Sequence, residues 1–209
     1  MGNHPLAIQD FNSAIDLDLD LSEGYFRRGF SKFYSQNYNE AIIDFKTAEE
    51  KERLHLETDP NLIKNAGIPD GLGCCYHALE QFVDAIDNYN TAITMDPSNT
   101  QFLMHRSQCK YDQGQFEDSI NDLNEGLAIN PIDPQVLYKL GLSYYADEKF
   151  KMCVSTLKKA LMNSPYISYE ADIYYHIGLA YCNVEKYEKS IYPFSRVSKS
   201  LSVYFCKVR

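Results

Sequence analysis

The stretch Gly71–Pro97, GLGCCYHALEQFVDAIDNYNTAITMDP, decides the fold because its pattern returns later in the chain. The stretch Tyr138–Pro165, YKLGLSYYADEKFKMCVSTLKKALMNSP, has the same order of small, aromatic, small and proline positions. Matching residues are 68 positions apart, as Gly73 and Gly141 are, and a third copy ending at Pro131 lies midway between them. A fixed period is the sequence signature of a repeat protein. The chain is therefore expected to consist of units of 34 residues.

Two more copies flank these three, one on each side. In every copy a small residue is followed nine positions later by an aromatic residue and twelve positions later by a second small residue. The first small residues are Gly29, Gly73, Ser107, Gly141 and Gly178; the aromatic residues are Tyr38, Phe82, Phe116, Phe150 and Tyr187; the second small residues are Ala41, Ala85, Ser119, Cys153 and Ser190. The pattern resembles the tetratricopeptide repeat family, whose unit is a helix-turn-helix of 34 residues.

The resemblance implies an all-α fold, an α-solenoid of antiparallel helix-turn-helix repeats that winds into a right-handed superhelix. Glycine inside a helix costs ~1 kcal/mol relative to alanine, so the glycines indicate a close approach by a neighbouring backbone. The second small residue is expected to face the glycine, so that small residues meet small ones. The aromatic residues are expected to close each hairpin near its turn. Pro97, Pro131 and Pro165 are expected to stop the second helices.

We expect one solenoid domain over residues 1–209. Its parts are a lone second helix at 1–19, a repeat with an extended second helix at 22–65, repeats at 66–99, 100–133, 134–167 and 171–203, and the start of a further helix at 204–209. Because solenoids need polar caps at their ends, we expect a section of a longer repeat protein, or partner chains that cover both ends.

Two spacings depart from the period. Gly29 and Gly73 are 44 residues apart, and seven of the ten extra residues fall between Ala48 and Pro60, which predicts about two further turns of the second helix. The breaker Pro69, together with Gly67, predicts that the next helix starts late. Nearer the C-terminus, the segment PYISYEA carries three extra residues, which we expect in a longer loop.

Composition excludes several classes of function. The formal net charge of -9 argues against a nucleic-acid partner, since that affinity depends on Lys and Arg. No run approaches the ~18 apolar residues of a membrane span, and the N-terminus lacks an apolar signal core, so we expect a cytoplasmic protein without membrane association. The six cysteines show no C-x-x-C spacing. Cys74, Cys75 and His77 form a weak C-C-x-H signal that we interpret as packing, with no metal.

The other motifs in the sequence do not support a metal-binding or catalytic role. Asp16, Asp18 and Asp20 resemble the start of a calcium loop, but Leu21 stands where glycine is needed and Arg27 where a bidentate Glu is needed, so this segment is interpreted as a turn. The five histidines show no nucleophile or second base at catalytic spacing. The chain is therefore not expected to be an enzyme or to use a cofactor.

In the resembled family the first helix of each repeat lines a concave groove, through positions three before, one after and four after the glycine position. Here those positions are mostly aromatic and uncharged, which is typical of the core of an interface. The predicted partner-binding residues are Phe26, Phe30, Phe33, His77, Met104, Gln108, Tyr111, Tyr138, Leu142, Tyr145, Tyr175 and Leu179. The implied guest is an apolar segment or an amphipathic helix. The alternative is that these side chains pack against their own neighbours.

The resemblance also implies what the groove does not bind. Family members that clamp acidic chaperone tails use Lys, Arg and Asn at set positions. In this chain those positions hold Phe26, Phe30 and Gly71 followed by Gln101 and His105, so a chaperone C-terminal tail is not expected.

The leading hypothesis is a non-catalytic protein-protein interaction scaffold within a larger assembly, of a ciliary or cytoskeletal kind, with neighbouring chains at its ends. The alternatives are a transient adaptor for short linear peptides and the accessory repeat region of a larger enzyme.

Overall fold

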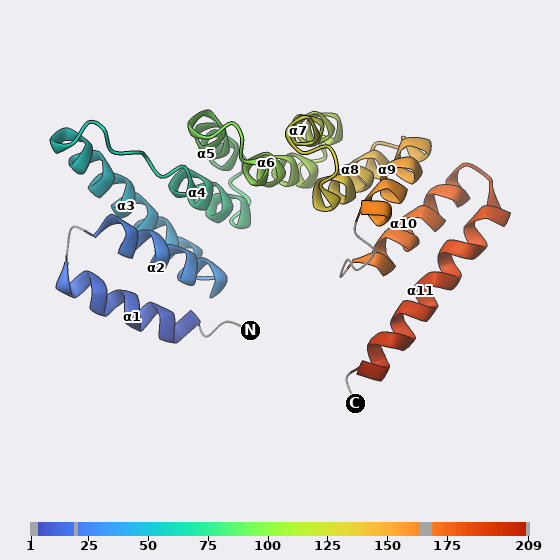
Figure 1. Ribbon diagram of the computed structural model, residues 1–209, viewed down its shortest axis with the longest axis horizontal. Coiled ribbons are helices and arrows are strands. Elements are labelled where there is room, and N and C mark those ends of the chain that lie inside the picture. The colour runs from blue at the N-terminus through green and yellow to red at the C-terminus, as the bar shows by residue number, and fades with distance from the viewer. Residues whose placement is uncertain (1–3, 19–20, 164–168, 208–209) are drawn as a thin grey trace. The chain divides into compact units, whose positions relative to one another are not determined.

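The computed structural model describes residues 4–18, 21–163 and 169–207. These residues form helices that follow one another as antiparallel pairs (Figure 1), and the described ranges contain no strand. The helices are α1 (His4–Leu17), α2 (Ser22–Tyr34), α3 (Tyr38–Thr58), α4 (Gly67–Ala78), α5 (Phe82–Met95), α6 (Thr100–Asp112), α7 (Phe116–Ile129), α8 (Pro134–Ala146), α9 (Phe150–Asn163), α10 (Glu170–Asn183) and α11 (Tyr187–Lys207). The predicted all-α solenoid of helix pairs is confirmed.

The contacts group the chain into two compact units, Met1–Cys109 and Lys110–Arg209, with the boundary inside α6. In the first unit α2 packs on α3 and α4 on α5, while α3 also contacts α4 of the next repeat. In the second unit α8 packs on α9 and α10 on α11, while α9 contacts α10. Each unit is therefore held together by contacts between successive helices. The single domain and the right-handed winding stay predictions.

The turn of every hairpin holds one residue with a left-handed backbone, seven residues after the first small position. The φ angles are 63° at Gln36, 58° at Glu80, 75° at Gly114, 57° at Glu148 and 57° at Glu185. Non-glycine residues adopt this region at a cost, so only the Gly114 turn holds the residue that suits it without strain.

Gly114→Ala is expected to lower the free energy of unfolding by about 1 kcal/mol, because Ala pays for the left-handed backbone that glycine adopts freely. The matched control is Gly126→Ala in α7, where an added Cβ would meet Val136 Cγ1 at 3.5 Å, an ordinary contact. That change should add up to about 1 kcal/mol, because Ala is the better helix former. Urea unfolding followed by circular dichroism measures both. If the free energy of unfolding changed in the same direction in both variants, the result would contradict the need for glycine in the Gly114 turn.

The aromatic residue of each repeat is the first residue of the second helix, as predicted. In three repeats its ring packs against the ring five residues earlier, on the first helix. The centroid distances are 5.6 Å for Phe33 and Tyr38, 5.3 Å for Tyr111 and Phe116, and 5.6 Å for Tyr145 and Phe150. The predicted role of these aromatic residues in closing the hairpins is therefore confirmed.

The glycines of the first helices make room for a large side chain, so the prediction that they face the small residue twelve positions later is wrong. A Cβ on Gly73 would lie 2.6 Å from Tyr89 Cε1, and one on Gly178 would lie 2.6 Å from Phe194 Cε1. Each of these partners lies sixteen residues after its glycine, on the second helix of the same hairpin. The helices approach closely because a ring fills the space that the missing Cβ leaves.

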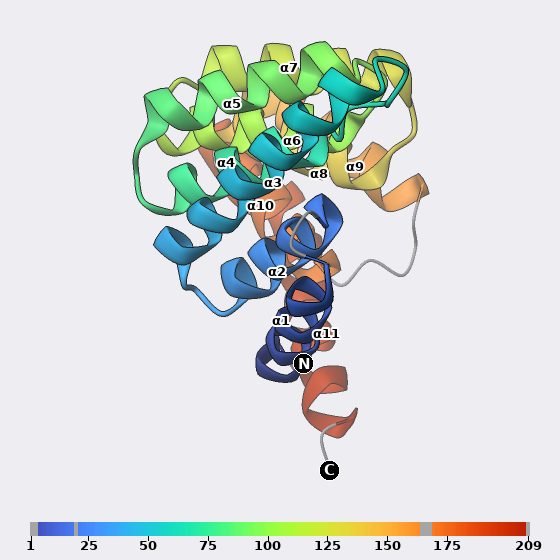
Figure 2. The same cartoon turned by 90° about the vertical axis from the view of Figure 1, so that its left-hand side faces the viewer.

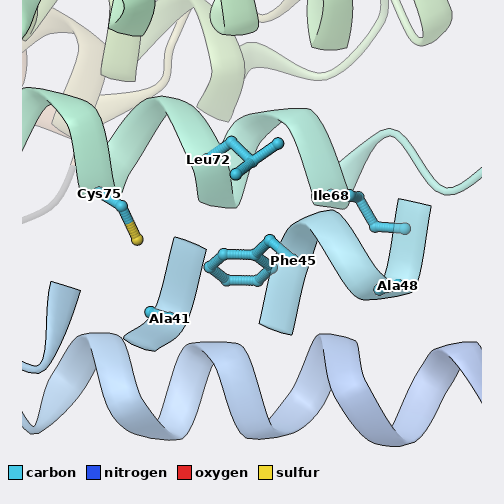
Figure 3. Packing of buried hydrophobic residues seen from close by; sticks show 6 residues of the cluster. All are labelled: Ala41, Phe45, Ala48, Ile68, Leu72 and Cys75. Carbon is cyan, nitrogen blue, oxygen red and sulfur yellow. The ribbon is translucent and has the colours of Figure 1, made fainter. Parts of the chain in front are cut away.

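Small residues do meet, but between successive repeats. Ala41 of α3 lies in one buried cluster with Cys75 of α4 (Figure 3), and both are fully buried. In the second unit Ser119 Oγ of α7 lies 3.0 Å from Ser143 Oγ of α8. The second small residue therefore sets how closely one repeat stacks on the next.

Phe45 is the largest side chain of the cluster in Figure 3, and it points from α3 towards α4. Its ring is fully buried and lies between two glycine backbones. A Cβ on Gly29, in its own hairpin, would lie 2.9 Å from Cε1, and a Cβ on Gly71, in the next repeat, would lie 2.6 Å from Cζ. The ring therefore joins two repeats.

The extended second helix is confirmed: α3 has 21 residues where α5, α7 and α9 each have 14. On its exposed surface Arg53 pairs with Glu50 and Glu57, both at 2.7 Å. The segment that follows is tied back to it, because Asn65 N donates to Glu52 Oε1 at 2.9 Å. The late start is also confirmed, as α4 begins one residue later in the repeat than α6 and α8 do.

The ends of the described chain agree with the predictions in part. Helix α1 matches the lone second helix predicted at 1–19. The prediction of a new helix from residue 204 is wrong, because α11 continues without a turn to Lys207 (Figure 1; Figure 2 shows its last turns). The predicted loop in PYISYEA lies largely at residues 164–168, outside the described residues. Across the described ranges, every helix is too short or too polar to cross a membrane.

Candidate functional site

The predicted groove positions lie on the first helices α2, α4, α6, α8 and α10. Most of the twelve side chains are half-buried, and Tyr175 is 45% exposed. Met104 is the exception, since it is 3% exposed and belongs to the core. Its assignment to a partner-binding surface is therefore corrected: a large apolar side chain on α6 fills the interior of the first unit.

Part of this set also packs within its own unit, as the alternative interpretation predicts. On α2 the rings of Phe26 and Phe30 meet edge to face at 5.0 Å, and Phe30 contacts Phe45 at the same distance. The residues four after the glycine position, Phe33 and Tyr145 among them, contact the aromatic residue that closes the hairpin. These side chains stabilise the fold and leave only part of their area to a partner.

The first helices of the second unit include the most exposed of the twelve side chains, Tyr175. We define the α8–α10 face as Tyr138 and Leu142 of α8 with Tyr175 and Leu179 of α10, helices that are in contact. Tyr175 is exposed, the other three side chains are half-buried, and none of the four carries a charge.

Tyr138 is fixed in this face by two neighbours. Its ring stacks on that of Tyr169 at 4.3 Å, and its hydroxyl donates to Asp172 Oδ2. Burial raises the pKa of Tyr138, and the hydrogen bond to Asp172 raises it further, so the hydroxyl stays protonated. Because these contacts already fix the Tyr138 ring, it presents a rigid apolar surface and would lose little conformational entropy when a partner binds.

Comparison with known families decides the identity of the repeat. A family model described as TPR repeat matches residues 110–147, and a second, described as tetratricopeptide repeat, matches residues 71–99. The chain is a tetratricopeptide repeat protein.

Solved structures share this tetratricopeptide repeat fold. The C-terminal part of a TPR repeat-containing protein from Cytophaga hutchinsonii is 20% identical, with a TM-score of 0.77 over 95% of this chain and 75% of that one. MamA from Desulfovibrio magneticus RS-1 is 16% identical, with a TM-score of 0.71 over 85% of this chain and 93% of that one. At these identities the likeness shows the fold alone.

A curated relative covers a smaller part. DnaJ homolog subfamily C member 7 homolog from Dictyostelium discoideum is 27% identical over 124 residues, which are 53% of this chain and 22% of the relative. This chain therefore spans about a fifth of the length of that protein.

Adjacent tetratricopeptide repeats also bring together three polar side chains in the first unit. His105 Nδ1 of α6 lies 2.8 Å from Asp70 Oδ1 and 3.6 Å from Cys74 Sγ of α4. Asp70 is buried, and the other two are half-buried. Burial lowers the pKa of His105, but the hydrogen bonds to Asp70 and Cys74 outweigh it and raise the pKa to about 10.

This cluster is not a catalytic triad. In a triad the imidazole joins the carboxylate through one nitrogen and the nucleophile through the other. Here Asp70 and Cys74 both face Nδ1 of His105, while Nε2 faces Gln101 Nε2 at 3.0 Å. The imidazole therefore cannot pass a proton from the thiol while the carboxylate holds its other side.

Sequence reasoning missed His105 because it is 31 residues from Cys74 and 35 from Asp70. The repeat register contains a usable signal. Asp70 and Cys74 stand three before and one after their glycine position, and His105 stands two before the matching position of the next repeat. Positions that face each other between successive first helices can thus be paired from the period.

Proposed function

We infer that this chain is a non-catalytic protein-protein interaction scaffold that binds an amphipathic helix or apolar segment of its partners on the first helices of its repeats. Tetratricopeptide repeat proteins generally act in protein-protein interaction and are typically non-catalytic. The observation that supports the finer proposal is the α8–α10 face, because it keeps uncharged aromatic and aliphatic area accessible on two helices in contact.

The spacing of the face supports a helical guest. Tyr138 and Leu142 are four residues apart on α8, as Tyr175 and Leu179 are on α10, so each helix presents two side chains one turn apart. An amphipathic helix presents apolar side chains at the same spacing, and can place them between these rows.

Tyr175→Ala is expected to weaken the binding of helix-forming peptides by about tenfold or more, as loss of a central aromatic anchor does at other interfaces. The probe is an array of amphipathic peptides of ~20 residues, long enough for a stable helix on binding, and the affinity of those retained is measured by fluorescence anisotropy.

The matched control is Tyr192→Ala on α11, a second helix, where the side chain is 63% exposed. It should leave the affinity unchanged. Equal losses for both variants, or no retained helical peptide, would contradict binding on the first helices.

The same array separates the alternatives. A transient adaptor for short linear peptides would retain short extended motifs as well as long helices, whereas the scaffold needs the longer helical guest. An accessory repeat region of a larger enzyme would be identified by a catalytic domain in the full gene product.

The proposed setting is a ciliary or cytoskeletal assembly in the cytoplasm. It is supported only by the resemblance of the repeats to those of such assemblies. Imaging of the tagged protein in its own cells, with markers for both structures, tests it, and a distribution that excludes both would overturn it.

A further inference from the structure

Asp70, Cys74 and His105 offer three metal-binding atoms of different kinds in the first unit. Asp70 and Cys74 lie four residues apart on α4, so their side chains leave the same side of the helix one turn apart. His105 approaches them from α6. The carboxylate oxygen, the sulfur and the imidazole nitrogen all lie within 4.8 Å of one another.

The chemical types of these three ligand atoms are those that zinc binds in proteins. Thiolate and imidazole are the ligands that Zn²⁺ takes most often in proteins, and carboxylate is the third. Calcium and magnesium prefer oxygen ligands alone, so one carboxylate beside a sulfur and a nitrogen disfavours them.

Two of the three distances between the ligand atoms are close to those around a tetrahedral ion. Two ligands of tetrahedral Zn²⁺ lie roughly 3.3–3.6 Å apart, given zinc-ligand bonds of about 2.0–2.3 Å. The 3.6 Å between Cys74 Sγ and His105 Nδ1 already fits this spacing. The 2.8 Å between Asp70 Oδ1 and Nδ1 is a hydrogen-bond length, so the carboxylate would move by about half an ångström when the ion replaces the shared proton.

We propose that Asp70, Cys74 and His105 bind one Zn²⁺ ion with three protein ligands. Binding releases the thiol proton of Cys74 and the proton that His105 shares with Asp70. The ion then balances the charges of one thiolate and one carboxylate. The half-buried faces of Cys74 and His105 give it a path from solvent, and water occupies the fourth position.

Outer contacts are in place for these ligands. The Tyr89 ring lies beside that of His105, with the ring centroids 6.0 Å apart. Gln101 lies against His105 Nε2, and a half-turn of its carboxamide places an acceptor for the Nε2–H. A zinc-bound histidine commonly donates its second N–H to such a partner.

Two neighbouring residues, Cys75 and His77, are excluded as zinc ligands by where their side chains lie. Cys75 points into the α3–α4 core beside Ala41 (Figure 3), and burial raises its pKa to about 12, so it stays a thiol. The His77 ring packs against Phe82 of its own hairpin, with the ring centroids 6.0 Å apart. The C-C-x-H spacing of the sequence is therefore not the ligand set.

The test uses the reduced full chain with Zn²⁺ against a chromophoric chelator, and Co²⁺ as a spectroscopic substitute. We expect one ion per chain, with a sulfur-to-cobalt charge-transfer band and the visible d–d bands of tetrahedral coordination. Cys74→Ser should abolish the charge-transfer band, and His105→Gln should weaken zinc binding by more than the ~10–100-fold that loss of an outer contact causes. Gln101→Ala should fall within that smaller range.

Cys182→Ser and His77→Gln are the matched controls, since both residues are half-buried on first helices but lie outside the cluster. They should leave stoichiometry and spectrum unchanged. Circular dichroism shows whether each variant is folded, and Asp70→Asn provides a third ligand variant if one is not. Absence of the charge-transfer band in the unsubstituted chain, or equal zinc affinity in the ligand and control variants, would overturn the proposal.

Discussion

Phe45→Ala is expected to lower the free energy of unfolding by about 3–5 kcal/mol, the range for removing a large buried aromatic side chain. The ring is fully buried and packed between the backbones of Gly29 and Gly71. Because α3 and α4 belong to successive repeats, the cavity would weaken the hairpin and the stacking together. Urea unfolding followed by circular dichroism measures the loss.

Two comparisons locate this effect. Tyr34→Ala removes an aromatic side chain that is 62% exposed, and should cost less than about 1 kcal/mol. Gly71→Ala should destabilise the unsubstituted chain, because its Cβ would meet the ring, but should be harmless in the Phe45→Ala background, where the space is open. A double-mutant cycle measures this coupling. Additive effects would show that Gly71 and the ring do not compete for space.

Asp44→Ala is expected to cost about 3–5 kcal/mol, the usual result of removing one partner from a buried ion pair. The Asp44 carboxylate is buried on α3 and accepts two hydrogen bonds from Arg28, from Nε at 2.9 Å and Nη2 at 2.7 Å. Lys32 Nζ lies 2.9 Å from Asp44 Oδ2. Arginine stays protonated in proteins, so the variant leaves the Arg28 guanidinium without the carboxylate that accepts its hydrogen bonds.

The matched control is Glu50→Ala on the same helix, where the pair with Arg53 is exposed. Solvent screens such a pair, so the urea midpoint should not move measurably. A combined variant, Arg28→Met with Lys32→Met and Asp44→Leu, should recover much of the stability, because apolar replacements remove the unpaired charge. A midpoint in the triple variant as low as in Asp44→Ala would show that lost packing, not charge, causes the effect.

Much of the fold follows from the period of the sequence. An aromatic residue marks the start of each second helix, and a proline stands two residues after the end of α5 and of α7. Such helix boundaries depend on local backbone chemistry and can be predicted from the sequence. The added length of α3 follows from counting residues. Pro193 shows the limit of such rules, because it lies inside α11, where tertiary packing overrides its tendency to end a helix.

Contacts between residues were harder to predict than helices. The pattern shows that Gly73 and Ala85 are small, but the register between two packed helices decides that the glycine faces Tyr89 instead. The same reason explains why the sequence did not predict the cluster of Asp70, Cys74 and His105, whose members belong to two repeats. Met104 looked like a surface residue because periodicity does not show how deeply a helix is covered.

The seven additional residues of α3 have a consequence for how such a protein can change in length. Seven residues rotate a helix by about 700°, within roughly 20° of two complete rotations, so side chains beyond the insertion keep the direction of those before it. An insertion of five residues would rotate everything downstream by about 500°, and would turn inward-facing positions outward. A helix of this kind therefore keeps its packed face only when the added length preserves its phase.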